Sequence, residues 1–572
     1  MAGEVMAGAD AVTLVELRVL DGPNLYFTRP AIKLTLGLGR WLAMPERQAS
    51  RLTARAGFET VSHAGAPGSE ERRRYMARFA VHLVRALAGA MGARLAVRGR
   101  PGPEFAEIVI AYPWRRRAAA EALGRELALL LGRSLDGRRS VERAVAEAAN
   151  RIDRVDPGPA PDILQPAIPV VSVTGTNGKT TTVRLIAHLA RKAGHVVAYT
   201  TTDGVYRNDE LVEAGDYSGF GGAEKALAQP DVSFAVLETA RGSILLRGIG
   251  TDHNDVAVVT NVTADHLDQY GIRTLDQLAE VKATVTRITR PSGWDVLNAD
   301  DPRVLAMRRH ASGRPWLFSL DADHPAIRGT LAEGGRAITV LDRDLVTMST
   351  GRHLRRLLPV EDIPVTLAGI SSHNISNAMA ATAAALGAGI PEDAVIEGLR
   401  SFTLDPEQNP GRANIFEVDR RVVVVDYAHN EDGMRGLVEI CQALRARGAR
   451  VFLAFAAAGD RTDRILHQLG YTAARGADRV AIAELHRYLR GREPQDVLAR
   501  LQAGVVDTGK PTAPVFRSEV EALEWMLRES TEDDVVAVTA LSQRPEIFRY
   551  LIERGGASAG PDRVKMLVKR AR

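Results

Sequence analysis

The chain has 572 residues, of which 45% are hydrophobic and 25% charged, and its formal net charge is only +4. One hydrophobic core cannot organise this length, so about two to four domains are expected. The low net charge and 5% aromatic content argue against nucleic-acid binding. No run of about 18 apolar residues and no basic, apolar leader is found, so neither a membrane span nor a signal peptide is expected. The one cysteine, Cys441, excludes an internal disulfide and favours a reducing, cytoplasmic location.

The first expected domain covers residues 1–154. Alternation of apolar and polar residues predicts strands at 13–20 and 105–112. Apolar residues at helical spacing predict amphipathic helices at 73–91 and 118–133. A small α+β domain is therefore expected at the N-terminus.

A proline-rich linker at 155–167 separates this domain from a different sequence texture. Over 168–358, short β-branched apolar runs alternate with helical patterns, as in a parallel sheet buried on both faces. A similar series over 359–572 predicts a second doubly wound α/β domain. Its expected strands lie at 421–429, 450–457, 478–485 and 534–541.

The strongest local motif is V-T-G-T-N-G-K-T-T at 173–181, which joins a buried strand to a helix. Its glycines let backbone N–H groups converge on an anion at a helix N-terminus. Lys179 is expected to reach the β- and γ-phosphates of a nucleotide, and the Thr180 hydroxyl to bind Mg²⁺. Val173 replaces the usual first glycine, so the loop predicts phosphate binding without specifying the reaction. The expected contacts are Gly175, Thr176, Asn177, Gly178, Lys179, Thr180 and Thr181.

Three further side chains are candidates for the reaction. Glu238 ends the strand F-A-V-L-E, at the sheet edge where ligands bind, and is expected to bind Mg²⁺. An acid at a helix start without a metal is the alternative. His266 follows the next strand and is a candidate second metal ligand, with a structural histidine as the alternative. Lys282 lies in a helical stretch, where the pattern alone predicts a solvated lysine.

Eight motifs, in order, resemble the Mur ligase family. They are T-G-T-N-G-K-T-T (174–181), E-T-A-R-G (238–242), N-V-T-A-D-H-L-D (261–268), L-N-A-D-D-P (297–302), H-N-I-S-N-A (373–378), G-R (411–412), D-Y-A-H-N (426–430) and G-D-R (459–461). Within this family the cyanophycin synthetase group is suggested by R-V-L-D-G-P-N-L (18–25), T-T-D-G (201–204), G-D-Y-S-G (215–219) and L-R-G-R (489–492). That group carries an ATP-grasp domain where this chain has only its linker. Ser243 and Asp268 stand where the group has glycine.

The resemblance implies a P-loop central domain and a Rossmann-like C-terminal domain. It also implies an ATP-dependent, ADP-forming ligase that activates a carboxylate as an acyl phosphate and joins it to an amine such as an amino acid. Lys179, Glu238, His266 and Lys282 would be catalytic, and Lys282 would be a carbamate facing the metal. The implied metal ligands are Thr180, Glu238, His266 and Lys282. Asn298 would bind adenine, Arg412 would lie near the γ-phosphate, Asp426 would bind ribose and His429 would lie near the nucleotide.

Two other interpretations stay open. One is a UDP-N-acetylmuramoyl-peptide ligase of peptidoglycan synthesis, and the other is a non-catalytic nucleotide- or polymer-binding protein. Intact Lys179 and Glu238 argue against the second. The expected partners are ATP, Mg²⁺, an amino acid, a carboxylate acceptor (a peptide or a polymer), a second copy of the chain and a separate ATP-grasp ligase, but no nucleic acid and no membrane.

The N-terminal domain is rich in arginine, which predicts a surface for an acidic acceptor because guanidinium forks pair bidentately with carboxylates. A solvated arginine-rich surface is the alternative. The arginines concerned are Arg72, Arg73, Arg74, Arg94, Arg98, Arg100, Arg115, Arg116, Arg117, Arg138 and Arg139.

Overall fold

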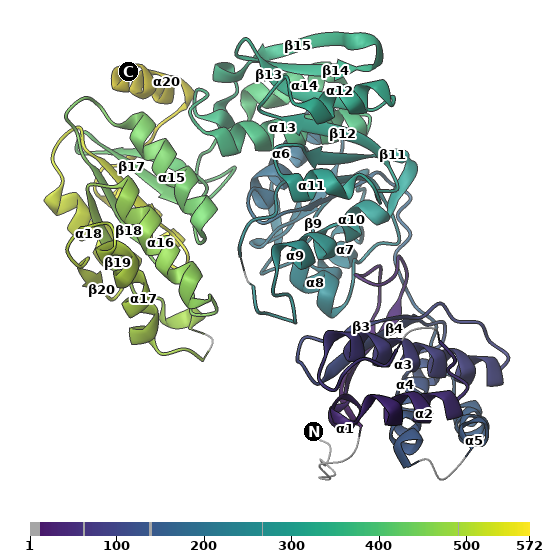
Figure 1. Ribbon diagram of the computed structural model, residues 1–572. Helices are drawn as coiled ribbons and strands as arrows, with labels where there is room; N and C mark the ends of the chain where they lie inside the picture. The colour runs from purple at the N-terminus through teal and green to yellow at the C-terminus, as the bar shows by residue number, and fades with distance from the viewer. Residues whose placement is uncertain (1–11, 61–62, 137–139, 266, 490) are drawn as a thin grey trace.

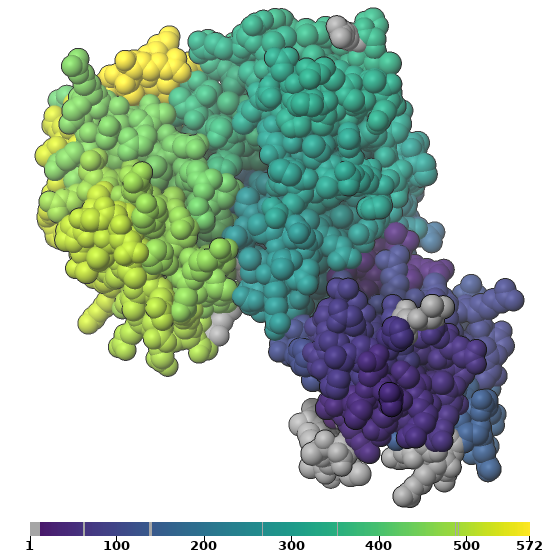
Figure 2. All heavy atoms as spheres, viewed as in Figure 1, coloured from purple at the N-terminus to yellow at the C-terminus, as the bar shows by residue number. Residues whose placement is uncertain are grey.

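The computed structural model describes residues 12–60, 63–136, 140–265, 267–489 and 491–572. The chain forms three lobes, and the central lobe contacts both of the others (Figure 1). Figure 2 shows the N-terminal lobe protruding from the central lobe, whereas the C-terminal lobe lies alongside the central lobe. No helix within these described ranges has the length and apolar character needed to cross a membrane.

The N-terminal lobe is a four-stranded antiparallel sheet in the order β1-β2-β4-β3, with helices packed against it. Its elements are β1 (Thr13–Leu20), β2 (Ala31–Gly37), α1 (Gly39–Ala43), α2 (Glu46–Arg55), α3 (Glu70–Ala90), β3 (Arg98–Pro101), β4 (Glu107–Pro113), α4 (Arg117–Asp136) and α5 (Val141–Asp153). The two strands and two helices predicted from periodicity are found as β1, β4, α3 and α4. Strands β2 and β3 were not predicted.

The motif at residues 18–25 forms the joint between the N-terminal and central lobes. Asn24 shapes the turn, because its Oδ1 accepts from the backbone N–H of Tyr26 at 3.0 Å and its Nδ2 donates to Gly22 O at 2.9 Å. A Cβ on Gly22 would lie 1.9 Å from the carbonyl oxygen of Ile249, so only glycine fits this contact. Leu20 and Leu25 share a hydrophobic cluster with helices of the central lobe. The two lobes therefore share a core.

The central lobe contains an eleven-stranded sheet in the order β15-β14-β13-β12-β11-β10-β5-β9-β6-β7-β8. From β13 through β6 all neighbours are parallel, as the apolar runs predicted, and antiparallel hairpins extend both edges. The strands are β5 (Val170–Thr174), β6 (Val197–Thr200), β7 (Gly204–Arg207), β8 (Glu210–Ala214), β9 (Phe234–Glu238), β10 (Asn254–Val259), β11 (Thr289–Asn298), β12 (Arg314–Ser319), β13 (Arg336–Leu341), β14 (Asp344–Ser349) and β15 (His353–Pro359).

Helices cover both faces of this sheet. The face with α6, α13 and α14 belongs to one large cluster, and α8, α9, α10 and α11 lie on the other face. The helices are α6 (Lys179–Lys192), α7 (Phe220–Leu227), α8 (Arg241–Leu246), α9 (Leu275–Lys282), α10 (Thr284–Arg287), α11 (Pro302–Met307), α12 (Pro325–Ala332), α13 (Ser372–Gly387) and α14 (Glu392–Ser401), with 3-10 turns η1 (Thr350–Arg352), η2 (Val360–Asp362) and η3 (Pro364–Thr366).

The packing of α13 and α14 bears on the expected domain boundary. Both helices pack against α6, so they belong physically with the central sheet although they follow residue 358. The next sheet begins only at Asn414. We therefore propose that the C-terminal domain begins in the connection at 402–413 rather than at 359.

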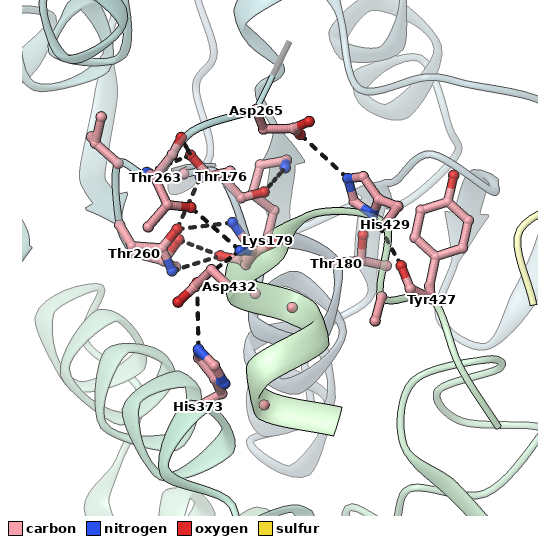
Figure 3. Close-up of a pocket in the computed structure, with 18 of the residues that line it drawn as sticks. Thr176, Lys179, Thr180, Thr260, Thr263, Asp265, His373, Tyr427, His429 and Asp432 are labelled. Atoms are coloured by element: carbon pink, nitrogen blue, oxygen red, sulfur yellow. Dashed lines mark hydrogen bonds and ion pairs between the residues drawn. The ribbon is translucent and has the colours of Figure 1, made fainter. Parts of the chain in front are cut away.

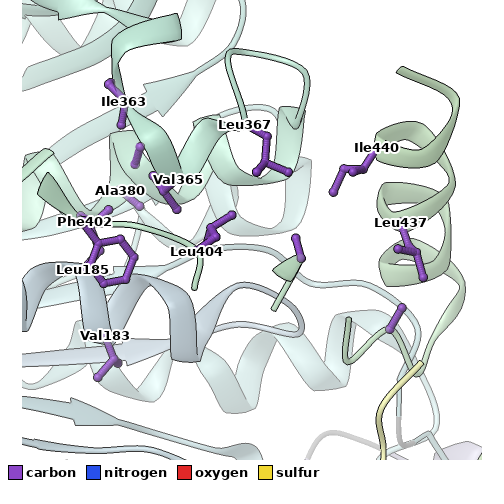
Figure 4. Packing of buried hydrophobic residues seen from close by; sticks show 14 of the residues in the cluster. Val183, Leu185, Ile363, Val365, Leu367, Ala380, Phe402, Leu404, Leu437 and Ile440 are labelled. Atoms are coloured by element: carbon purple, nitrogen blue, oxygen red, sulfur yellow. The ribbon is translucent and has the colours of Figure 1, made fainter. Parts of the chain in front are cut away.

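The C-terminal lobe is a seven-stranded sheet in the order β20-β19-β18-β21-β17-β16-β22. Its elements are β16 (Asn414–Val418), β17 (Arg421–Asp426), α15 (Glu431–Leu444), β18 (Val451–Phe455), α16 (Asp463–Gly476), β19 (Arg479–Ala483), η4 (His486–Tyr488), α17 (Pro494–Val506), β20 (Val515–Phe516), α18 (Glu519–Glu529), β21 (Val535–Thr539), α19 (Arg544–Glu553), β22 (Ala557–Ser558) and α20 (Pro561–Ala571). Figure 4 shows Leu437 and Ile440 of α15 beside Leu367 of the central lobe, in one continuous cluster.

A buried carboxyl group lies inside the central sheet, away from the phosphate loop. Asp295 on β11 is fully buried and accepts hydrogen bonds from Thr289 Oγ1 at 2.7 Å and Gly313 N at 2.8 Å. Burial raises the pKa of Asp295 from 3.8 to about 7, against the lowering effect of these two hydrogen bonds. The folded chain therefore holds a proton here that the unfolded chain releases at lower pH. The stability that this group contributes is present below pH 3.8 and is lost as the pH rises through about 7.

We expect Asp295→Asn to remove this pH dependence. The amide oxygen can accept from Gly313 N–H and the amide nitrogen can donate to Thr289 Oγ1, so the variant should melt at a higher temperature than wild type at pH 8 and near the same temperature at pH 4. Thermal unfolding across this range measures the difference, with the exposed Asp323→Asn as the control for loss of charge. A variant that is less stable than wild type at pH 8 would contradict the assignment.

Candidate functional site

The phosphate loop joins the carboxyl end of β5 to the start of α6. Gly178 has φ +85° and Gly175 has φ +154°. A Cβ on Gly178 would lie 2.2 Å from Asn377 Oδ1, and one on Gly175 would lie 1.8 Å from Thr260 Oγ1. The Lys179 ammonium folds back and donates to Thr176 O at 2.9 Å. The loop is thus wrapped tightly around the N-terminus of α6, where unpaired backbone N–H groups favour an anion.

Residues 260–263, which follow β10, hold the phosphate loop through hydrogen bonds. Asn261 Oδ1 accepts from the backbone N–H of Asn177 at 2.9 Å, and Thr260 Oγ1 donates to Asn177 O at 2.6 Å. Thr263 N donates to Thr176 Oγ1 at 3.0 Å. The sequence motif at 261–268 was recognised, but this supporting role was not predicted.

Glu238 and Lys282 are buried beside the loop, with 2% and 3% of their surfaces exposed. Thr180 Oγ1 donates to Glu238 Oε2 at 2.9 Å, whereas Oε1 is buried without a hydrogen-bond partner among the described residues. Burial raises the pKa of Glu238, and the charge of Lys179 opposes that rise. Lys282 Nζ donates to Gly175 O at 2.5 Å, and burial, followed by the charge of Lys179, lowers its pKa well below the usual lysine value. Lys282 is therefore not the solvated lysine that the helical pattern alone predicted.

The C-terminal lobe supplies the opposite wall. Arg412 lies with Nη2 3.5 Å from Thr180 Oγ1 and stacks over the Tyr427 ring at 4.4 Å. Asp426 ends β17, accepts from Ala413 N at 2.8 Å and has its pKa raised by burial. The His429 ring lies with Nε2 3.3 Å from Asp265 Oδ2.

Side chains from the two lobes meet directly over the loop, as Figure 3 shows for Asp432 and His429. Asn177 Nδ2 donates to Asn430 Oδ1 at 3.1 Å and to Asp432 Oδ2 at 2.8 Å. His373 Nε2 lies 3.4 Å from Asp432 Oδ2, and this hydrogen bond is the main reason that the pKa of His373 is raised. The sequence did not predict roles for Asn430 or Asp432, since their partner lies some 250 residues away in the chain.

These groups line one cavity of about 1050 Å³ between the central and C-terminal lobes. Asn298 also lines it, and its Nδ2 donates to Thr260 O at 2.8 Å. His266, expected to be catalytic and a metal ligand, lies outside the described residues. The expected residues that line the cavity are Gly175, Thr176, Asn177, Gly178, Lys179, Thr180, Thr181, Glu238, Lys282, Asn298, Arg412, Asp426 and His429.

The N-terminal arginines do not form one open surface. Arg72 is fully buried and donates to four backbone carbonyls, including Trp41 O and Met44 O, both at 2.9 Å. It therefore organises the lobe interior and cannot bind an acceptor, which corrects its inclusion in the predicted surface. Arg73 bonds Gly102 O and Glu104 O. Arg138 and Arg139 lie outside the described residues.

Two family models match the chain. Residues 173–385 match the Mur ligase middle domain, and residues 411–541 match the model described as Mur ligase, glutamate ligase domain. Cyanophycin synthetase from Synechocystis sp. is 39% identical over 386 residues, which cover 66% of this chain and 44% of that protein. The chain thus matches less than half the length of this curated relative. UDP-N-acetylmuramoyl-L-alanyl-D-glutamate–2,6-diaminopimelate ligase from Geobacillus thermodenitrificans is 27% identical over 383 residues, covering 64% of this chain and 73% of that protein.

Solved structures show the same architecture. A bifunctional folylpolyglutamate synthase/dihydrofolate synthase with Mn, AMPPNP and L-glutamate bound has a TM-score of 0.50 at 18% identity, over 68% of this chain and 91% of that one. E. coli FolC in complex with ADP has a TM-score of 0.51 at 20% identity, with the same coverage. The expected P-loop central domain, Rossmann-like C-terminal domain and small N-terminal domain are confirmed as a fold.

We expect Gly178→Ala to weaken binding of a non-hydrolysable ATP analogue by at least about tenfold, because the new methyl would collide with Asn377 and move the loop. Isothermal titration calorimetry measures this. Gly194→Ala is a matched control, since Gly194 has a similar φ of +86° just after the same helix, but its Cβ would meet nothing within 4 Å. Equal losses in both variants would show that backbone strain alone, and not the loop geometry, governs binding.

Proposed function

Because the chain belongs to the Mur ligase family, we propose that it is an ATP-dependent, ADP-forming ligase that joins a carboxylate to an amine. The observation that carries this proposal is the convergence of the phosphate loop, Glu238 and Lys282 with Arg412 and Asp426 of the other lobe on a single cavity. Such a cavity can hold a nucleoside triphosphate with its γ-phosphate next to the buried side chains of Glu238 and Lys282.

In the proposed reaction, an oxygen of the acceptor carboxylate attacks the γ-phosphorus, and ADP leaves with the bridging oxygen. The amine then attacks the acyl carbon and phosphate leaves. Lys179 and the N-terminus of α6 neutralise charge on the transferred phosphoryl group, and Arg412 approaches it from the other lobe. Positioning and electrostatics suffice for this chemistry, so no protein nucleophile is required.

The hydroxyl of Thr180 and the carboxylate of Glu238 lie together and are suited to bind Mg²⁺. Glu238 Oε1 is buried without a hydrogen-bond partner among the described residues, and carboxylate oxygens suit this hard cation. Over the described ranges, no group of three or more His, Cys, Asp or Glu could hold a metal ion by itself, so nucleotide phosphates would supply further ligands. When bound, Mg²⁺ would neutralise phosphate charge. We propose that His266 and carbamylated Lys282 complete its surroundings.

Two comparisons bear on the alternatives. Identity to cyanophycin synthetase is 39%, against 27% to the muramoyl-peptide ligase, which favours the cyanophycin synthetase type. A non-catalytic binding protein would not need Lys179, Glu238 and Lys282 kept together around the loop.

We propose that the amine is an amino acid and that the acceptor is an acidic peptide or polymer, made by a separate ATP-grasp ligase in the cytoplasm. The exposed arginines among those predicted to form the acceptor surface support an anionic acceptor. They are Arg74, Arg94, Arg98, Arg115, Arg116 and Arg117.

We expect Lys179→Ala to reduce ATP turnover by about 10² to 10³-fold or more, because the transferred phosphoryl group loses a charged contact. ADP release in the presence of amino acids and short acidic peptides measures this. Lys192→Ala is the matched control, since Lys192 lies at the far end of the same helix and pairs with Glu397. Near-normal turnover by a folded Lys179→Ala protein would overturn the ATP assignment.

We expect Lys282 to carry a carbamate and Lys282→Ala to be inactive but partly rescued by small carboxylic acids. A carbamate forms on a neutral amine, and the buried position of Lys282 favours that form. Carbon-13-labelled bicarbonate should give a carbamate NMR signal in wild type that the variant lacks. Sodium chloride at matched ionic strength controls for salt in the rescue. A wild-type enzyme that is active yet shows no such signal would refute the carbamate.

A further inference from the structure

Arg241 lies at the start of α8, three residues after Glu238, and lines the same cavity. Its Nη2 donates to Gln269 Oε1 at 2.6 Å. Its Nη1 is buried and has no hydrogen-bond partner among the described residues. Arg241 also approaches the Tyr270 ring, with Cζ 5.9 Å from the ring centroid. One half of the guanidinium is therefore held in place while the other half is left without a partner.

The acids near Arg241 are engaged elsewhere. Asp265 contacts Arg461 at 3.1 Å, and Asp460 also pairs with Arg461. Within the described ranges, Arg241 itself forms no ion pair. Burial lowers the pKa of Arg241, and the nearby charges of Asp265 and Asp460 oppose that effect. Neither carboxylate accepts a hydrogen bond from Nη1, which stays without a hydrogen-bond partner among the described residues. The geometry thus calls for an anion at Nη1.

The location of Arg241 selects among the possible anions. In the proposed function the phosphate loop and Lys179 bind the nucleotide phosphates. Arg241 begins α8, just after β9 ends at Glu238, and lines the same cavity as Glu238 and Lys282. In the proposed reaction, the attacking carboxylate must lie beside the phosphate loop, and Arg241 lines the cavity that contains this loop. On the basis of the proposed function, we infer that Arg241 binds the reacting carboxylate of the acceptor and holds it for that attack.

Gln269 is a positioning residue for this contact. Its Nε2 donates to Asp460 O at 3.2 Å and to Asp460 Oδ2 at 3.0 Å, and Asp460 belongs to the C-terminal lobe. The same amide therefore receives its orientation from one lobe and transmits it to Arg241 in the other. Asp460 lies in the G-D-R motif at 459–461. The motif therefore has a role in this arrangement: the contact between Arg241 and the acceptor carboxylate depends on a C-terminal lobe that packs against the central lobe.

Hydroxylamine trapping isolates the step in which the carboxylate reacts. The acceptor oxygen bonds to the γ-phosphorus as the bond to the β-γ bridging oxygen breaks and ADP leaves. Hydroxylamine nitrogen then bonds to the acyl carbon, phosphate leaves and a proton is lost to solvent, which gives a hydroxamate. The assay contains ATP, Mg²⁺, hydroxylamine and short poly-L-aspartate or poly-L-glutamate peptides, but no amino acid.

We expect Arg241→Gln to lower hydroxamate formation at sub-saturating peptide on the order of 10- to 100-fold, because a charged hydrogen bond to the carboxylate is lost. Arg241→Lys should lie between Gln and wild type, since it keeps the charge but not the fork. Gln269→Ala should also lower hydroxamate formation at sub-saturating peptide, by raising the KM for the peptide. Arg308→Gln removes an exposed arginine of the same lobe outside the cavity and should behave as wild type.

Binding of AMPPNP to the Arg241 variants, measured by calorimetry, should stay within about twofold of wild type. An equal loss of AMPPNP affinity would overturn the inference, because Arg241 would then bind phosphate. Unchanged hydroxamate formation together with a raised amino-acid KM would also overturn it, because the residue would then bind the amine substrate. If wild type itself forms no hydroxamate with either peptide, the proposed function fails, and the inference fails with it.

Discussion

The site depends on keeping two charged side chains, Glu238 and Lys282, out of water beside the phosphate loop. Burial drives each toward its neutral form, as the raised pKa of Glu238 and the lowered pKa of Lys282 indicate. Transfer of an ion into such surroundings costs about several kcal/mol, and the single hydrogen bonds from Thr180 and to Gly175 O offset only part of that. In the proposed function, Mg²⁺ would offset the charge of Glu238, and a carbamate on Lys282 would replace the ammonium cation. The burial of these two groups beside the loop thus fits the proposed binding of Mg²⁺ there.

The structure around the site holds these buried groups and the phosphate loop in place. The loop follows β5, which is buried along its length and pairs with β9 and β10, and α6 packs against α13 and α14. At the mouth of the cavity, Asn177 binds the C-terminal lobe through Asn430 and Asp432. Leu437 and Ile440 also line the cavity, and they continue the core of the central lobe. Asn177 belongs to the phosphate loop and also binds the C-terminal lobe, so the conformation of the loop and the position of that lobe depend on each other.

Sequence patterns predicted the helices, strands and turns whose conformation is set by residues close together in the chain. Apolar runs at helical or alternating spacing identified β1, α3 and the parallel strands from β5 to β11, but not the parallel strands β12 and β13, and glycine spacing identified the loop. Partners distant in the chain were not predictable: nothing near Asn430 indicates that it meets Asn177, and nothing near Arg72 indicates four carbonyl oxygens around it. The open edges of the central sheet were missed because short exposed strands such as β8 carry no clear alternation.

The joint at residues 18–25 connects the N-terminal lobe to the helices that carry site residues through packed apolar side chains. Leu20 and Leu25 share a cluster with Ile244 of α8 and Leu278 of α9, and these two helices carry Arg241 and Lys282. Charged contacts reinforce both attachments, since Arg247 pairs with Asp21 and Arg100 with Glu280. Removal of the whole lobe would therefore expose the apolar backs of the helices that position the site. A change in acceptor use after such a deletion could not separate lost acceptor binding from displaced catalytic groups, whereas substitutions of exposed arginines leave the joint intact and can separate them.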